Sequence, residues 1–163
     1  SHGQEIYENP SPGNKEGGIT TLEEKSLGCT AKSGSTAVTG GYPYGAPVDK
    51  KGLVLLSAPG NDLVATTALV ASGAHLVLFT TGRGTPFGGP APTVKISTNN
   101  ELFHKKRGWI DFNAGDIANG KSLEECAGEL LAYVIELASD EINTQNETHG
   151  IREISIFKDG VFL

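Results

Sequence analysis

The sequence predicts an α/β fold with a mostly parallel, Rossmann-like sheet flanked by helices, long Gly-rich amino-terminal loops and a carboxyl-terminal hairpin. Residues 53–57 and 76–79 are short apolar runs, a pattern typical of strands buried on both faces. Apolar residues recur at helical spacing between them, so this stretch predicts a right-handed strand–helix–strand crossover. Ligands of open parallel sheets bind beyond the carboxyl ends of the strands, which are residues 58–62 and 80–86 here.

Length and charge limit the class of protein. With 163 residues the chain fits one domain, in which loops and a short helix at 1–52 pack on an α/β core at 53–163. The formal net charge is −6 and the 13 basic residues are scattered, which argues against nucleic acid as a partner. The sequence contains no long apolar run and no secretory leader, so we expect no membrane span and a cytoplasmic protein. The lack of an initial Met suggests a fragment of a longer chain.

The amino-terminal part is rich in turn-forming residues. Residues 1–18 predict an ordered loop, with the alternative of a floppy leader. Thr20 or Thr21, each followed three residues later by a glutamate, is a capping signal for a short helix that ends near Gly28 or Gly34. Residues 28–45 predict a second irregular segment. Long loops in compact domains are uncommon unless they are functional or disordered, so these two favour a functional role.

The remaining elements follow from caps and periodicity. Asn61 or Asp62 caps the crossover helix, which ends at Gly73. The alternating residues 93–97 predict a third strand, 99–108 a short basic helix, and 109–113 a fourth strand. A capping box at 122–125 begins the strongest amphipathic helix, which continues to about Ile142. Residues 143–150 predict a polar loop, and 153–158 with 161–163 predict the hairpin.

The Gly-Arg-Gly-Thr turn at 82–85 carries the first chemical signal. Its amides and guanidinium suit an anion, because arginine binds carboxylate or phosphate through two parallel hydrogen bonds. The sequence contains no G-x-G-x-x-G, P-loop or G-x-S-x-G motif, which disfavours dinucleotides, P-loop nucleotides and serine hydrolase chemistry. Cys29 and Cys126 show neither a disulfide framework nor the spacing of zinc ligands.

Several long segments resemble one enzyme family. They occur in the family's order at residues 7–15, 17–29, 56–62, 79–87, 92–96 and 109–115. Together they resemble the carboxyl-terminal region of the altronate/galactarate dehydratase family over nearly the whole chain. The resemblance implies a cytoplasmic sugar-acid dehydratase that uses Fe(II) or a similar divalent metal such as Mn(II). Family members are much longer, so it also implies that amino-terminal and middle domains of the same protein are partners.

Dehydration of a sugar acid suggests roles for particular residues. We expect Arg83 and the amides of Gly82, Gly84 and Thr85 to hold the carboxylate, although an arginine can also simply pin a loop. Asn61, Asp62 and Asn113 suit polyol hydroxyls, with helix capping or turn formation as the alternative. Lys25 and Lys95 are candidate bases if burial lowers their pKa, and are otherwise surface charges or carboxylate partners. Cys29 with Glu24 is the candidate metal pair.

The prediction is therefore the carboxyl-terminal domain of a metal-dependent hydro-lyase that forms a 2-keto-3-deoxy acid from altronate or galactarate. The isolated domain is expected to be inactive. The alternatives are a non-catalytic carboxylate-binding or assembly domain and a subunit of sulfolactate sulfo-lyase type. A homo-oligomer is left open.

Overall fold

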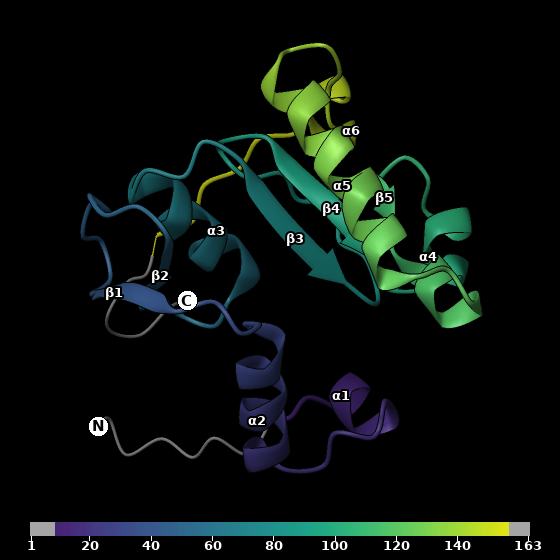
Figure 1. The fold of residues 1–163 in the computed structure, drawn as a ribbon, viewed down its shortest axis with the longest axis horizontal. Coiled ribbons are helices and arrows are strands. Elements are labelled where there is room, and N and C mark those ends of the chain that lie inside the picture. The colour runs from purple at the N-terminus through teal and green to yellow at the C-terminus, as the bar shows by residue number, and fades with distance from the viewer. Residues whose placement is uncertain (1–8, 157–163) are drawn as a thin grey trace, which may run out of the picture. The chain divides into compact units, whose positions relative to one another are not determined.

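The structure is a computed structural model that describes residues 9–156 (Figure 1). The chain divides into two compact units at Thr39 and Gly40. Each unit is described below by itself. The predicted boundary at residue 52, and the packing of residues 1–52 on the core, stay predictions.

The first unit contains two capped helices. Helix α2 (Leu22–Lys32) begins with the predicted capping box, in which Glu24 N donates to Thr21 Oγ1 at 3.1 Å. Helix α1 (Pro12–Glu16) lies in the segment predicted to be a loop. The loop prediction was wrong for these residues because Ser11 and Asn14 form a second capping box and proline occupies the first helical turn, where its missing N–H has no effect.

Strand β1 (Val38–Tyr42) begins two residues before the division and pairs with β2 (Leu53–Leu56) of the second unit in a two-stranded sheet, which is followed by helix α3 (Asp62–Ala71). The crossover prediction was wrong about pairing, because β2 does not join the sheet that contains β3. None of the four β2 residues is fully buried, and Leu55 is 54% exposed. An apolar run indicates burial but does not specify the neighbouring strand. Strand β1 likewise falls within a segment predicted to be irregular.

The main sheet is parallel, as predicted. Its order is β3-β4-β5, formed by β3 (Val77–Thr81), β4 (Thr93–Ser97) and β5 (Phe112–Asn113). The register runs from Val77 opposite Thr93 to Thr81 opposite Ser97, and then from Ser97 to Asn113. All five β4 residues are buried because β4 is the central strand and both of its faces are covered.

The two faces of β4 differ in polarity. Val94 and Ile96 point to one face and pack against Leu137 of helix α5 (Leu123–Ala138), which runs along the sheet (Figure 1). Partly buried side chains surround this core, namely Leu76, Phe112, Ala114, Leu130, Tyr133 and Ile142. Because side chains alternate along a strand, Thr93, Lys95 and Ser97 share the other face. That face is polar, and the loop at 82–91 covers it.

Short helices complete the unit. Helix α4 (Asn100–Lys105) follows β4 directly, and the 3-10 helix η1 (Gly115–Asn119) follows β5. Helix α5 ends at Ala138, earlier than predicted, with Ser139 as its C-cap. Helix α6 (Gln145–Thr148) replaces the predicted polar loop, because Thr144 and Glu147 form a capping box. No helix in residues 9–156 is long and apolar enough to cross a membrane.

The predicted carboxyl-terminal hairpin falls partly outside the described residues. Residues 153–156 are not a strand. They instead lie along the loop at 82–91 and α3, because Glu153 N donates to Gly88 O at 2.8 Å and Ser155 N to Thr67 Oγ1 at 3.1 Å. Residues 157–163, which include the second arm of the hairpin, are outside the part of the chain that the structure describes.

Candidate carboxylate-binding edge

The three strands of the main sheet end at the same edge. Strand β3 ends at Thr81, β4 at Ser97 and β5 at Asn113. The segments that follow β3 and β4 line a hollow of about 380 Å³ in the second unit. Its lining residues are Gly82, Arg83, Asn99, Glu101, Leu102 and Lys105. The predicted Arg83 turn therefore lies at the predicted edge of the sheet.

Side chains of the sheet and of α4 hold the Arg83 turn. Gly84 N donates to Thr81 Oγ1 at 2.9 Å, and Asn99 Nδ2 donates to Gly82 O at 3.0 Å. Gly84 has a φ of +80°, and a Cβ there would lie 2.8 Å from a methyl carbon of Leu102. Glycine at 84 thus lets the turn adopt a left-handed backbone and pack on α4. Contacts within the chain thus hold the backbone of the turn.

Asn113 lies at the same edge but is engaged with its own chain. Its Nδ2 donates to Asn100 Oδ1 at 2.8 Å, and its Oδ1 accepts from Gly115 N at 3.0 Å. Asn100 Nδ2 in turn donates to Asp116 Oδ1 at 2.8 Å. These hydrogen-bonded side chains connect α4, β5 and η1 at this edge of the sheet. Asn113 is not among the residues that line the hollow.

Asn61 and Asp62 lie after β2, which belongs to the other sheet. Asn61 is the N-cap of α3, and its Oδ1 accepts from Val64 N at 3.3 Å. Asp62 is an exposed residue of the first helical turn, where a negative charge suits the helix dipole. Neither residue lines the hollow beside Arg83. The rule that ligands bind beyond the carboxyl ends of parallel strands applies only within one sheet. It therefore does not place these two residues beside Arg83.

Lys95 is fully buried, with 0% exposure. Its Nζ donates to Thr85 O at 2.6 Å and lies 5.5 Å from the ring centroid of Phe87. Burial lowers the pKa of Lys95 from its ordinary value of 10.5 to about 8, and the nearby charges of Asp111 and Glu153 oppose this shift. The sequence made Lys95 a candidate base on the condition that burial lowers its pKa, and burial does lower it. Its ammonium nevertheless contacts the protein interior, and Lys95 does not line the hollow.

Asp111 is the carboxylate beneath Lys95. Its two oxygens accept hydrogen bonds from Lys95 N at 2.7 Å and from Gln145 N at 2.6 Å. Burial raises the pKa of Asp111, and these two amide hydrogen bonds oppose the rise. Burial also raises the pKa of Tyr133 to about 12, with Asp111 contributing. Asp111 thus connects the backbone of β4 to the start of α6.

Lys25 belongs to the first unit. Its Nζ donates to Asn9 Oδ1 at 2.7 Å and to Asn14 Oδ1 at 3.2 Å. This unit contains a hollow of about 350 Å³, which is lined by Asn9, Leu22, Lys25, Ser26 and Cys29. An ammonium group has three donors, and these two asparagines occupy two of them and fix its direction. The structure therefore brings together Lys25 and Cys29, which lie one helical turn apart on α2.

Glu24 and Cys29 do not form a ligand pair. They are five residues apart on α2, so their side chains leave the helix about 140° apart around its axis. The Glu24 carboxylate accepts from Thr20 N at 2.8 Å and from Thr21 N at 3.2 Å. Hydrogen bonds from Thr20 and Thr21 lower the pKa of Glu24. Residues 9–156 contain no group of three or more His, Cys, Asp or Glu side chains placed to hold a metal ion.

Three polar residues of the hollow were not predicted as site residues. They are Asn99, Glu101 and Lys105. Asn99 and Glu101 appeared in the sequence only as the capping signal of a short basic helix. The available signal was their position directly after the strand at 93–97, on the same edge as the Arg83 turn.

The chain matches the family described as D-galactarate/Altronate dehydratase, C-terminal, over residues 1–162. It is 56% identical over 163 residues to altronate dehydratases of Escherichia coli (strain K12) and Bacillus subtilis (strain 168). These matches cover 100% and 99% of this chain but only 33% of each relative. A galactarate dehydratase (L-threo-forming) of Escherichia coli (strain K12) is 40% identical over 152 residues, which is 91% of this chain and 29% of that relative. The chain thus spans about a third of the length of these relatives.

Proposed function

Because this chain belongs to the carboxyl-terminal family of D-galactarate and altronate dehydratases, we propose that it forms part of the active site of a sugar-acid hydro-lyase. The substrate class is an aldonic or aldaric acid, as the names of the relatives suggest. The contribution of the second unit is to hold the substrate carboxylate at the edge that carries Arg83.

The observation that supports this role is the hollow beside Arg83. Two cationic side chains, Arg83 and Lys105, line it together with Glu101. A guanidinium binds a carboxylate through two parallel hydrogen bonds, and an ammonium adds a second positive charge. Glu101 can accept hydrogen bonds from the hydroxyls of a polyhydroxy chain. The turn that carries Arg83 is held by Thr81 and Asn99, so binding requires little further ordering of the backbone.

The main requirement of dehydration is to stabilise the negative charge that develops on the substrate. A base removes the proton on the carbon next to the carboxylate, and the electron pair enters the carboxylate to form a dianionic enediolate. The electrons then return to form a carbon–carbon double bond as the neighbouring hydroxyl leaves with a proton as water. The resulting enol becomes a 2-keto-3-deoxy acid. Fixed positive groups at the carboxylate stabilise the dianion more than the substrate, which is the condition for faster reaction.

Lys25 is our candidate for proton transfer within the first unit. Asn9 and Asn14 hold its Nζ in one direction, as a proton-transfer group requires. A divalent metal, Fe(II) or Mn(II), would supply further stabilisation of the enediolate charge. Glu24 and Cys29 do not fit that metal, for the geometric reasons given above.

Activity of the full-length enzyme that carries this domain tests the proposal. Purified enzyme supplied with Fe(II) is incubated with altronate or galactarate, and the 2-keto-3-deoxy product is measured. Arg83→Ala should lower kcat/KM by about 100-fold or more, since it removes a charge-assisted pair of hydrogen bonds. Arg83→Lys should recover only part of this loss. The matched control is Arg107→Ala, because Arg107 is exposed and contacts Phe103 and His104 rather than the hollow.

The rival proposal is a non-catalytic carboxylate-binding or assembly domain. It predicts that the Arg83→Ala enzyme keeps its turnover, while altronate no longer binds the isolated 163-residue chain in an NMR titration. Wild-type kcat/KM in the Arg83→Ala enzyme would rule out Arg83 as a contributor to catalysis.

A further inference from the structure

The loop at 82–91 leaves β3, folds back across the polar face of the sheet and returns into β4. Three side chains hold the carbonyl groups of its first half. Asn99 Nδ2 donates to Gly82 O at 3.0 Å, Lys95 Nζ to Thr85 O at 2.6 Å, and Asn146 Nδ2 to Pro86 O at 3.1 Å. Two of these residues, Asn99 and Asn146, are neutral. Lys95 alone among the three can offer a charged donor, and hydrogen bonds from charged donors are about twice as strong as neutral ones.

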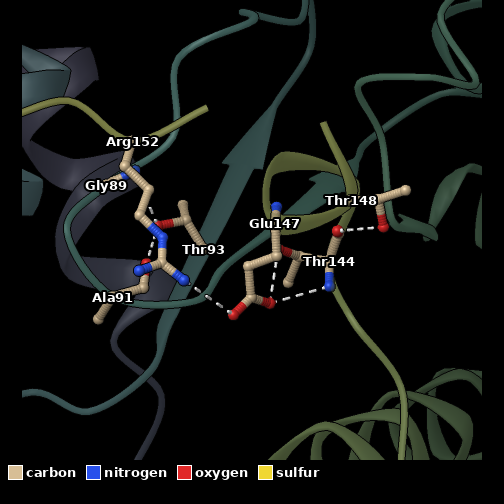
Figure 2. A network of polar contacts seen from close by, with 7 residues as sticks. All are labelled: Gly89, Ala91, Thr93, Thr144, Glu147, Thr148 and Arg152. Carbon is tan, nitrogen blue, oxygen red and sulfur yellow. Dashed lines mark hydrogen bonds and ion pairs between the residues drawn. The ribbon is translucent and has the colours of Figure 1, made fainter. Parts of the chain in front are cut away.

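The second half of the loop is held by different groups. Gly89 N donates to Thr93 Oγ1 at 3.2 Å, and Thr93 Oγ1 donates to Ala91 O at 2.9 Å (Figure 2). A Cβ at Gly88 would lie 2.3 Å from Ile151 O, so the backbone at 88 packs directly on the segment after α6. These contacts anchor the end of the loop near β4. They do not reach residues 82–86, which are held by Lys95, the two asparagines and the bond from Gly84 N to Thr81 Oγ1.

Lys95 lies where a substrate cannot reach it. Its side chain is fully buried, the Phe87 ring covers its ammonium, and the residues that line the hollow beside Arg83 do not include it. A general base must come within hydrogen-bond distance of the proton that it removes. The geometry of Lys95 instead directs its ammonium at a carbonyl two residues after Arg83.

We propose that Lys95 is the positioning residue of the Arg83 turn: by donating to Thr85 O from the central strand, it fixes the backbone that presents Arg83 to the substrate carboxylate. This inference rests on the proposed function for its consequence in binding, but not for the ordering of the turn itself. If Lys95 were the general base, it would act on the substrate directly. As a positioning residue, it affects the substrate only through Arg83.

The test uses Lys95→Met in the 163-residue chain, which keeps the length of the side chain and removes the donor. Amide hydrogen exchange is followed in residues 82–85 and in α5. Loss of a hydrogen bond from a charged donor should speed exchange in residues 82–85 about tenfold or more and leave α5 unchanged. The matched control is Lys50→Met, since Lys50 is an exposed lysine of the same unit. Unchanged exchange in the turn, or an equal rise in α5, would overturn the inference.

Binding separates action through Arg83 from a merely structural role. Galactarate and altronate are titrated into wild type, Lys95→Met, Arg83→Ala and the double variant, with the dissociation constant read from NMR shifts. We expect the dissociation constant of Lys95→Met to rise about tenfold, with no further loss when Arg83 is already absent. Losses that multiply in the double variant would refute action through Arg83. If wild type binds neither sugar acid, the proposed function fails, and the exchange data still decide the role of Lys95.

Lys95→Arg provides a second variant if Lys95→Met does not fold. Arginine keeps a charged donor but changes its reach to Thr85 O. Faster exchange confined to residues 82–85 would support the inference. A turn that exchanges as in wild type while the variant loses stability would contradict it.

Discussion

Lys95→Met also tests the electrostatic description of the buried face of β4. Burial lowers the pKa of Lys95 from 10.5 to about 8, so between these pH values the unfolded chain binds a proton that the folded chain lacks. Where the unfolded state binds more protons, the free energy of unfolding rises with pH. This lowering of the Lys95 pKa corresponds to about 3 kcal/mol in total, most of which falls between about pH 7 and pH 10. Stability is therefore lower below pH 8 and is gained as the pH rises toward 10.5.

The assay is urea unfolding of the 163-residue chain at several pH values between about 7 and 10. The difference between wild type and Lys95→Met isolates the lysine, because all other titrating groups are shared. Wild type should gain about 2–3 kcal/mol relative to Lys95→Met over this range. Tyr133, whose pKa burial raises to about 12, acts in the opposite direction only above its ordinary value of 10.0. Parallel pH profiles for the two proteins would show that Lys95 titrates normally and would refute the reasoning.

Further substitutions probe the loop, the buried carboxylate and a helix end. Gly88→Ala places a Cβ 2.3 Å from Ile151 O and should lower the free energy of unfolding by about 3 kcal/mol or prevent folding. Gly128→Ala on α5, where no atom lies within 4 Å, should raise the free energy of unfolding by about 0.5–1 kcal/mol. Equal urea midpoints for these two variants would contradict the packing of the loop. Asp111→Asn leaves one acceptor for the amides of Lys95 and Gln145 and should cost about 2–3 kcal/mol in urea unfolding, so a neutral effect would show that the carboxylate is not needed there. Ser122→Ala removes the N-cap of α5 and should lower stability by about 1 kcal/mol, and an unchanged melting temperature would count against the cap.

The sequence predicted the parallel sheet from the apolar run at 76–79 and the alternating run at 93–97, and the hollow beside Arg83 lies beyond the carboxyl ends of these strands. The expectation that the first run is buried on both faces was wrong, because β3 lies at the edge of the sheet and its Leu78 is 49% exposed. The same logic failed for β2 because an apolar run does not say which strand pairs with it. The capping signals located the starts of α2 and α5. The same type of signal, Thr144 with Glu147, was present before α6 but stood in a segment too polar to suggest a helix.

The environment of Lys95 could not be predicted from the sequence. A lysine in an alternating strand normally points to solvent, and its burial here depends on the loop at 82–91 folding back over the sheet. That return depends in turn on contacts with residues far along the chain, such as Asn146 and Glu153. Lys105 and Glu101 were missed for a related reason. A six-residue helix that directly follows β4 carries them to the strand edge, and pattern alone does not give its direction.

The alternation along β4 has a consequence for how the strand finds its place. A shift of one residue would turn Lys95 toward Leu137 and the apolar side of α5, and would turn Val94 and Ile96 toward the carbonyl groups of the loop. The shifted strand would bury an ammonium without an acceptor and leave polar groups facing methyls, and both are costly. An all-apolar β4 would lack this penalty and could settle in either register. The polar face of β4 thus helps to specify a single register for the strand.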